Sequence, residues 1–248
     1  MGLRMSGAPP IPSIRRVNNG ILSEYERPVL DYLASRLPSS VSPNDLTLFG
    51  VFGAFLAAAG FWLSNWGGGF LSLAALGMVV NWFGDSLDGT VARLRNVERP
   101  STGFFIDHTA DLFSQVVIVL SLGASPYVHF GVASLMLAAY LAASVFTYVR
   151  LHALQVHYLS QHGLGPTELR LALVFGCALG IVFGSVNFKV GSATILAGDV
   201  MVACIAIGTF VSTFVTGAGL CLELLRDDAS NCASESDRPV TIVKSAAE

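Results

Sequence analysis

Four aspartates form two closely spaced pairs in the middle of the chain. Asp85 and Asp88 are three residues apart at the end of one apolar stretch, and Asp107 and Asp111 are four apart at the start of the next. Side chains at these spacings share one face of a helix. Because a short connection makes the two helices antiparallel neighbours, we expect the four carboxylates to converge.

The predicted depth of these carboxylates requires compensating positive charge. At about 1.5 Å per residue, Asp85 lies roughly 22 Å along a helix that begins at Phe70, within a hydrocarbon core about 30 Å thick. Each unpaired ion there costs at least about 2.5–3.5 kcal/mol. Arg93 alone cannot balance four carboxylates, and all-oxygen ligands suit Mg²⁺, Mn²⁺ or Ca²⁺ better than zinc. A divalent metal site is therefore predicted.

Two other interpretations of the acidic cluster stay open at this point. A solvated helix end would also carry several acids, although the helical spacing and the membrane depth disfavour it. A cation transporter is the non-enzymatic alternative, because acids within the membrane often mark ion pathways. Transporter sites favour the bilayer midplane and repeated halves, and no repeat is visible in this sequence.

The elements that position the aspartates are predicted membrane spans. Hydrophobic residues make up 53% of the chain and charged residues 12%. No charged residue occurs from Leu46 to Gly84 or from Leu112 to Val149, and one span needs roughly 20 apolar residues. The predicted fold is an all-α polytopic membrane protein with about six transmembrane helices. Their expected ranges are 46–64, 70–90, 104–122, 126–149, 169–187 and 195–224.

The remaining segments flank this 46–225 transmembrane domain. Residues 1–17 are predicted to be a flexible N-terminus, and 226–248 a disordered cytoplasmic tail. Residues 18–37 place their apolar side chains on one stripe, which predicts an amphipathic juxtamembrane helix on the membrane surface. The net charge of −3 and the absence of a basic, aromatic-interleaved stretch argue against nucleic acid as a partner.

The distribution of basic residues predicts the orientation. All of the 14 Lys and Arg residues except Lys189 fall on one side of the predicted spans. The positive-inside rule then places both termini and the aspartates on the cytoplasmic side. Gly176, Gly180 and Gly184 form a small-residue seam along one span. Such a seam allows another helix to approach closely, either within the chain or in a homodimer.

The sequence around the aspartates resembles a family signature. Residues 85–93 read DSLDGTVAR, and residues 103–111 read GFFIDHTAD. This matches the pattern DxxDGxxAR, a short gap, and GxxxDxxxD of the CDP-alcohol phosphotransferase (phosphatidyltransferase) family. The resemblance implies a phospholipid-biosynthetic enzyme of a bacterial or archaeal cell membrane. Such an enzyme moves a substituted phosphate from a CDP-linked donor to an alcohol acceptor and releases CMP.

The resemblance also implies roles for individual residues. Asp85, Asp88 and Asp107 would bind Mg²⁺ or Mn²⁺, with two ions expected, because paired ions can neutralise a pyrophosphate. Asp111 would bind metal or accept the proton of the attacking hydroxyl. The remaining motif positions would bind the nucleotide: small residues leave room for cytidine, and the arginine donates to phosphate oxygens. These positions are Gly89, Ala92, Arg93 and Gly103.

Two branches of the family remain possible. In the first, CDP-diacylglycerol is the donor, and Arg150 and Arg170 bind a small phosphorylated acceptor. In the second, a CDP-choline or CDP-ethanolamine donor reacts with diacylglycerol. His108 and Glu168 resemble positions of choline/ethanolamine phosphotransferases, where they would jointly deprotonate the lipid hydroxyl. About six spans instead of about ten favour the first branch.

Overall fold

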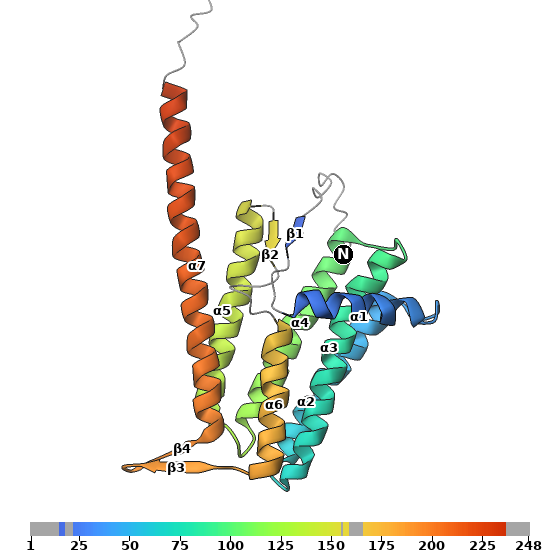
Figure 1. Ribbon diagram of the computed structural model, residues 1–248, viewed down its shortest axis with the longest axis vertical. Coiled ribbons are helices and arrows are strands. Elements are labelled where there is room, and N and C mark those ends of the chain that lie inside the picture. Colours follow the sequence, from blue (N-terminus) through green and yellow to red (C-terminus); the bar gives the residue numbers. More distant parts are fainter. Residues whose placement is uncertain (1–14, 18–21, 155, 159–165, 237–248) are drawn as a thin grey trace, which may run out of the picture.

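Six apolar helices form a membrane-spanning bundle. The computed structural model describes residues 15–17, 22–154, 156–158 and 166–236. Within these residues, six helices are long and apolar enough to cross a membrane, which confirms the predicted all-α polytopic fold. They pack side by side (Figure 1) and comprise α2 (Pro43–Leu63), α3 (Leu71–Leu94), α4 (Pro100–Gly123), α5 (Phe130–Leu154), α6 (Pro166–Phe183) and α7 (Ala197–Ser236).

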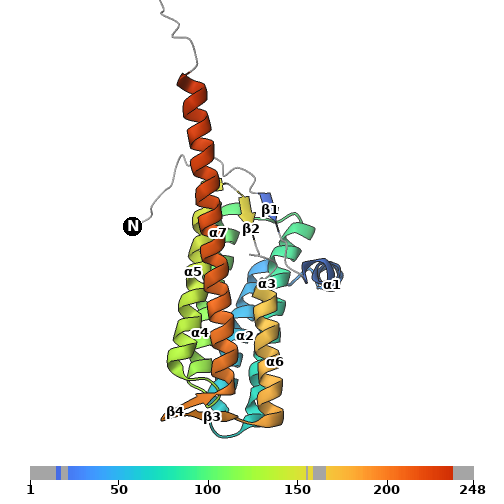
Figure 2. The same ribbon diagram turned by 60° about the vertical axis from the view of Figure 1, so that its left-hand side comes forward.

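A shorter helix lies across the bundle. Helix α1 (Ser23–Arg36) runs crosswise to the spans beside α3, as the two views in Figures 1 and 2 show. Its apolar inner face joins a small core with the ends of α2 and α3, where Ala34, Leu46 and Leu87 are buried. Tyr25 and Tyr32 are exposed on the other side. Residues 18–21 of the predicted amphipathic helix lie outside the described residues.

The closest helix contact joins α2 to α3 and fixes the position of two aspartates. Small residues on both helices let the two backbones touch. A Cβ atom on Gly53 would lie 2.8 Å from the carbonyl oxygen of Gly77, and one on Gly84 would lie 2.5 Å from Cα of Gly50. The side chain of Asn81 donates to the Gly50 carbonyl at 3.0 Å. This contact sets the register of α3, which carries Asp85 and Asp88.

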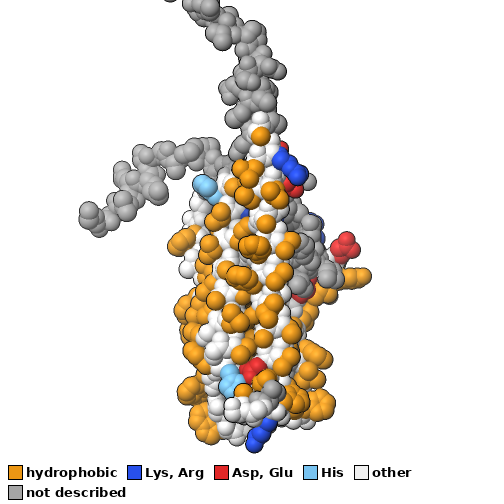
Figure 3. Space-filling model, turned by 90° about the vertical axis from the view of Figure 1, so that its left-hand side faces the viewer, with side chains coloured by type: hydrophobic (Ala, Val, Ile, Leu, Met, Phe, Trp, Pro, Cys, Tyr) orange, Lys and Arg blue, Asp and Glu red, His pale blue; other side chains and the backbone are white. Residues whose placement is uncertain are grey.

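The opposite end of the bundle holds a β-hairpin that the sequence did not predict. The 3-10 helix η1 (Gly68–Phe70) joins α2 to α3, and β3 (Asn187–Val190) pairs antiparallel with β4 (Ala193–Leu196) between α6 and α7. Asp199 holds this end together, since its carboxylate accepts hydrogen bonds from the backbone amides of His129 at 2.7 Å and Leu196 at 2.9 Å. Figure 3 shows that hydrophobic side chains cover the face of the bundle that lies on the left-hand side of Figure 1.

Two further features differ from the sequence-based expectations. Helix α7 continues to Ser236, whereas a disordered tail was predicted to begin at residue 226. No Gly or Pro occurs between Leu225 and Ser236, so nothing in the local sequence ends the helix. In addition, the short strands β1 (Arg15–Val17) and β2 (Val156–Tyr158) pair in parallel. Residues 1–14 and 237–248 lie outside the described residues.

Candidate metal and phosphate site

The four aspartates converge between α3 and α4, as their spacing predicted. Carboxylate oxygens of Asp85, Asp107 and Asp111 lie within 4.8 Å of one another. Together with Asp88, these residues line one narrow cavity of about 10 Å³. Each helix contributes one face to this cavity, because the paired aspartates are separated by about one helical turn. We call these four side chains the carboxylate cluster.

Asp88 is the most enclosed member of the cluster, with 5% of its surface exposed. Its carboxylate accepts hydrogen bonds from the hydroxyl of Thr47 and from the backbone amide of Gly89. Thr47 lies near the start of α2, which a capping box between Ser42 and Asp45 holds in place. Thr47 was not predicted as a site residue, since only the packing of α2 on α3 brings its hydroxyl to the cluster.

Arg170 on α6 brings positive charge to the cluster. Its Nη1 lies 2.6 Å from Oδ2 of Asp85, and its Nη2 lies 3.7 Å from Oδ1 of Asp111. The arginine side chain is only 14% exposed. It was predicted to bind an acceptor, and the structure places it directly against two of the four carboxylates. One guanidinium still leaves the cluster with an excess of negative charge.

The donor set of the cluster fits a divalent cation. Asp85, Asp107 and Asp111 offer oxygen atoms close enough to share one ion, and Asp88 lines the same cavity. Mg²⁺ and Mn²⁺ prefer carboxylate oxygens, whereas zinc sites are usually completed by nitrogen or sulfur ligands. The excess negative charge at membrane depth also favours binding of a divalent cation. These residues therefore suit the predicted metal, while the number of ions stays a prediction.

His108 and Glu168, which were predicted to act as a pair, contact different parts of the structure. His108 lies on α4 with its Nδ1 3.3 Å from Asp107, and its ring stacks on Phe104 at a centroid distance of 4.0 Å. Glu168, in the first turn of α6, accepts a hydrogen bond from the backbone amide of Leu22 at 3.2 Å. The described contacts thus place His108 beside the cluster and Glu168 at the junction of α6 with α1.

The predicted nucleotide-binding residues lie near the end of α3 and the start of α4. Arg93 folds back along α3 and donates to the hydroxyl of Thr90 at 3.0 Å. Its guanidinium also covers Gly89, where an added Cβ would lie 3.3 Å from Nη1. Ala92 and Gly103 are half-buried, one on each helix. Small residues therefore occupy three of these four positions, and the arginine lies over one of them.

Arg150 and Glu26 also lie at this end of the bundle. Arg150, the second predicted acceptor-binding residue, is half-buried near the end of α5. Glu26 was not predicted as a site residue, yet its carboxylate joins three helices. It accepts hydrogen bonds from Trp82 Nε1 at 2.7 Å, from Ser86 Oγ at 3.3 Å and from Thr167 Oγ1 at 3.2 Å. Glu26 thereby links α1 to both helices that carry the Asp85–Arg170 pair.

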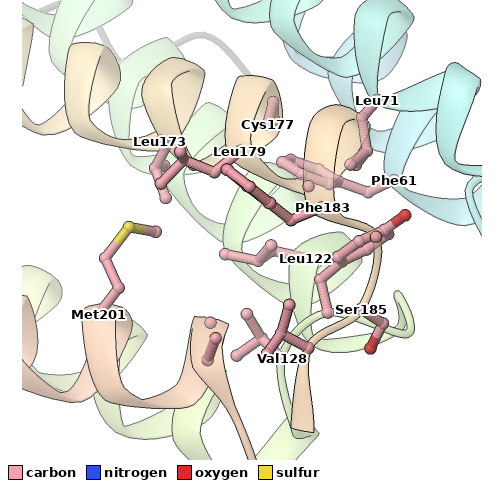
Figure 4. A pocket seen from close by; sticks show the side chains of 17 residues that line it. Phe61, Leu71, Leu122, Val128, Leu173, Cys177, Leu179, Phe183, Ser185 and Met201 are labelled. Atoms are coloured by element: carbon pink, nitrogen blue, oxygen red, sulfur yellow. The ribbon is translucent and has the colours of Figure 1, made fainter.

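A larger cavity lies at the other end of the bundle and does not suit phosphate chemistry. It measures about 290 Å³ and is lined by residues near the ends of α2 and α6 and near the starts of α3 and α7, among them Phe61, Leu71, Phe183 and Met201. Its walls are almost entirely apolar (Figure 4). A charged pyrophosphate would lose its hydration there without gaining ionic partners. The carboxylate cluster is therefore the candidate reaction site.

Comparisons with known proteins agree with this geometry. Residues 40–211 match the CDP-alcohol phosphatidyltransferase family model. An uncharacterized protein of Aquifex aeolicus is 29% identical over 174 residues, which cover 70% of this chain and 76% of that protein. The crystal structure of phosphatidylinositol phosphate synthase from Mycobacterium tuberculosis, with CDP-DAG bound, is similar with a TM-score of 0.52. At 19% identity, this match covers 75% of the present chain and 90% of the other, and it supports the fold.

Proposed function

Since the chain belongs to the CDP-alcohol phosphatidyltransferase family, we propose that it transfers a phosphatidyl group from CDP-diacylglycerol to a small hydroxylated acceptor and releases CMP. The protein is thus an integral membrane enzyme, a CDP-alcohol phosphotransferase. The observation that carries the proposal is the convergence of Asp85, Asp107 and Asp111 on one cavity.

The carboxylate cluster has the chemistry that the reaction needs. Asp85, Asp88, Asp107 and Asp111 would hold Mg²⁺ or Mn²⁺, which would neutralise the donor pyrophosphate and the departing CMP phosphate. Two neutral donors, the Thr47 hydroxyl and the Gly89 amide, hold the Asp88 carboxylate in place.

We assign the proton-accepting role to Asp111. It lines the cavity and lies farther from the Arg170 guanidinium than Asp85 does, 3.7 Å against 2.6 Å. A carboxylate with the weaker cationic contact keeps more of its affinity for a proton. Glu168 is engaged by the amide of Leu22, which supports Asp111 over a His108–Glu168 pair as the base.

The position of Arg170 supports a phosphorylated acceptor. A guanidinium can bind a phosphate in bidentate fashion, and Arg170 lies beside the carboxylate that we propose as the base. An acceptor phosphate at Arg170, with Arg150 as the second basic group, would direct the acceptor hydroxyl towards Asp111. Glycerol phosphate and inositol phosphate are acceptors of this class.

The donor is tested by a direct substrate comparison. Purified enzyme with Mg²⁺ receives CDP-diacylglycerol plus either phosphorylated acceptor, or a CDP-aminoalcohol plus diacylglycerol, and CMP release is followed. We expect acceptor-dependent CMP only from CDP-diacylglycerol. Product from CDP-choline or CDP-ethanolamine would instead assign the second branch, and loss of that activity in both His108→Ala and Glu168→Gln would move the base to that pair.

Orientation and assembly complete the proposal. We place both termini and the carboxylate cluster on the cytoplasmic side, on the basis of the Lys and Arg distribution. Two of the three glycines in the predicted seam pack within the chain. Gly176 and Gly180 face side chains of the same chain, since added Cβ atoms would lie 2.7 Å from Met201 Cε and 2.6 Å from Leu71 Cδ1. Light scattering of the purified enzyme would measure its mass.

A further inference from the structure

The inner wall of the carboxylate cavity carries two neutral polar side chains. Asn81 precedes Asp85 by four residues on α3, and Ser114 follows Asp111 by three residues on α4. Because the helices are antiparallel, both positions lie one turn deeper in the bundle than the aspartates. Both line the same cavity as the cluster, and they are 2% and 4% exposed.

Asn81 has one amide atom fixed and the other without a partner. Its Nδ2 donates to the carbonyl oxygen of Gly50 at 3.0 Å. The amide orientation follows from this contact, because Oδ1 in that place would face another oxygen acceptor. Among the described residues, Oδ1 is buried and has no hydrogen-bond partner. A buried acceptor left in this way has lost its hydration without gaining a partner, which is unfavourable.

A purely structural role explains only half of this arrangement. The hydrogen bond to Gly50 strengthens the α2–α3 contact, and the Nδ2 group alone provides it. The carbonyl half of the amide contributes nothing to that contact. It does add a neutral amide oxygen to a cavity that four carboxylates and the hydroxyl side chains of Thr47 and Ser114 also line. Side-chain amide oxygens are ordinary ligands of hard divalent cations.

We propose that Oδ1 of Asn81 is a further oxygen ligand of the divalent cation, on the membrane side of the site. This inference rests on the metal-dependent function proposed above. A neutral ligand suits the deepest position, because a fifth carboxylate there would add negative charge farther from water. The Gly50 carbonyl orients the amide in advance, so little conformational freedom is lost when the cation binds.

Metal binding without substrate provides the test. Mn²⁺ titrations, followed by electron paramagnetic resonance, compare purified wild-type protein with Asn81→Leu and Asn81→Asp. Asn81→Leu removes the oxygen at similar side-chain length, and we expect the Mn²⁺ dissociation constant to rise about 10- to 100-fold, as for other groups that support metal sites. Asn81→Asp keeps the oxygen, so Mn²⁺ should bind at least as tightly as to the wild type.

A matched control separates the ligand role from the loss of an asparagine–backbone hydrogen bond. Asn65 donates to the carbonyl oxygens of Trp62 at 2.8 Å and Ala124 at 3.0 Å, at the far end of the bundle. Asn65→Leu should leave Mn²⁺ affinity unchanged. Should Asn81→Leu fail to fold, Asn81→Ala removes the same oxygen without placing an apolar chain against α2.

The outcomes distinguish this inference from the proposed function. Wild-type Mn²⁺ affinity in Asn81→Leu or Asn81→Ala, or weakened binding in Asn81→Asp, would overturn the ligand role while leaving the transferase proposal intact. Conversely, a wild-type protein that binds Mn²⁺ but releases no CMP from any CDP-linked donor contradicts the proposed function. The titration series would then still decide the role of Asn81.

Discussion

Replacing Arg170 with methionine tests whether the cluster depends on positive charge. The side chain is 14% exposed and lies 2.6 Å from Asp85 and 3.7 Å from Asp111. Removing one partner of such a largely buried pair costs about 3–5 kcal/mol, because the carboxylates stay behind without their cation. At about 2–4 °C per kcal/mol for a chain of this size, the melting temperature of metal-free protein should fall by ~6–20 °C.

Mg²⁺ should reverse much of this loss. A cation that binds only the folded protein stabilises it by about 2.7 kcal/mol at 100 times its dissociation constant. In Arg170→Met, the cation replaces the missing guanidinium, so the difference in melting temperature from the wild type should shrink as Mg²⁺ is added. The assay is thermal unfolding in one detergent, after EDTA treatment and along a Mg²⁺ titration.

Arg95→Met is the matched control. Arg95 donates to the backbone carbonyls of Val41 at 2.6 Å and Leu37 at 3.0 Å, so its loss should destabilise the protein without a response to Mg²⁺. Two results would exclude this role of Arg170. One is an unchanged melting temperature of metal-free Arg170→Met, and the other is a difference in melting temperature from the wild type that stays the same at saturating Mg²⁺. Either would mean that Arg170 does not balance the charge of the cluster.

Three further predictions concern the elements around the site. Glu26→Ala removes the hydrogen-bond acceptor shared by Trp82, Ser86 and Thr167. Amide hydrogen exchange at the start of α6 should therefore accelerate, and turnover should fall. Glu24 is exposed on the same helix, and Glu24→Ala should change neither quantity. Gly84→Leu drives a side chain into the backbone of α2 and should prevent accumulation of folded protein, whereas Gly69→Ala meets open space and should be tolerated. In a chain whose native cysteines are replaced, a cysteine at Asn96 should resist impermeant thiol reagents applied outside intact cells. Labelling from outside would reverse the proposed orientation.

The sequence predicted the spans well because membrane helices follow simple rules of length and composition. Two long charge-free stretches indicated four of the six helices, the apolar runs after residue 168 indicated the other two, and the DxxD and DxxxD spacings brought the four aspartates together. The β3–β4 hairpin was missed, since residues 188–194 were taken only as the connection between two predicted spans. Helix α7 was predicted too short, because the charged and small residues after Leu225 indicated a disordered tail, whereas the helix continues to Ser236.

The partners of the site residues required three-dimensional packing. Thr47 lies 41 residues from Asp88, and Glu26 lies 141 residues from Thr167, so no local spacing connects them. The ion pair of Arg170 with Asp85 likewise depends on how α6 packs against α3. Asn81 carried a weak signal, an amide one turn before the first aspartate of the motif. Its buried, unpartnered oxygen became visible only with the α2–α3 contact in place.

We propose that the carboxylate cluster performs metal-dependent transfer from a CDP-linked donor. The most direct measurement is CMP release from CDP-diacylglycerol by purified enzyme, with and without exhaustive EDTA treatment, for the wild type and for Asp107→Asn. We predict that EDTA abolishes release, that added Mg²⁺ or Mn²⁺ restores it, and that folded Asp107→Asn stays inactive under both conditions. CMP release that persists after complete metal removal, or near-wild-type turnover by Asp107→Asn, would contradict the account.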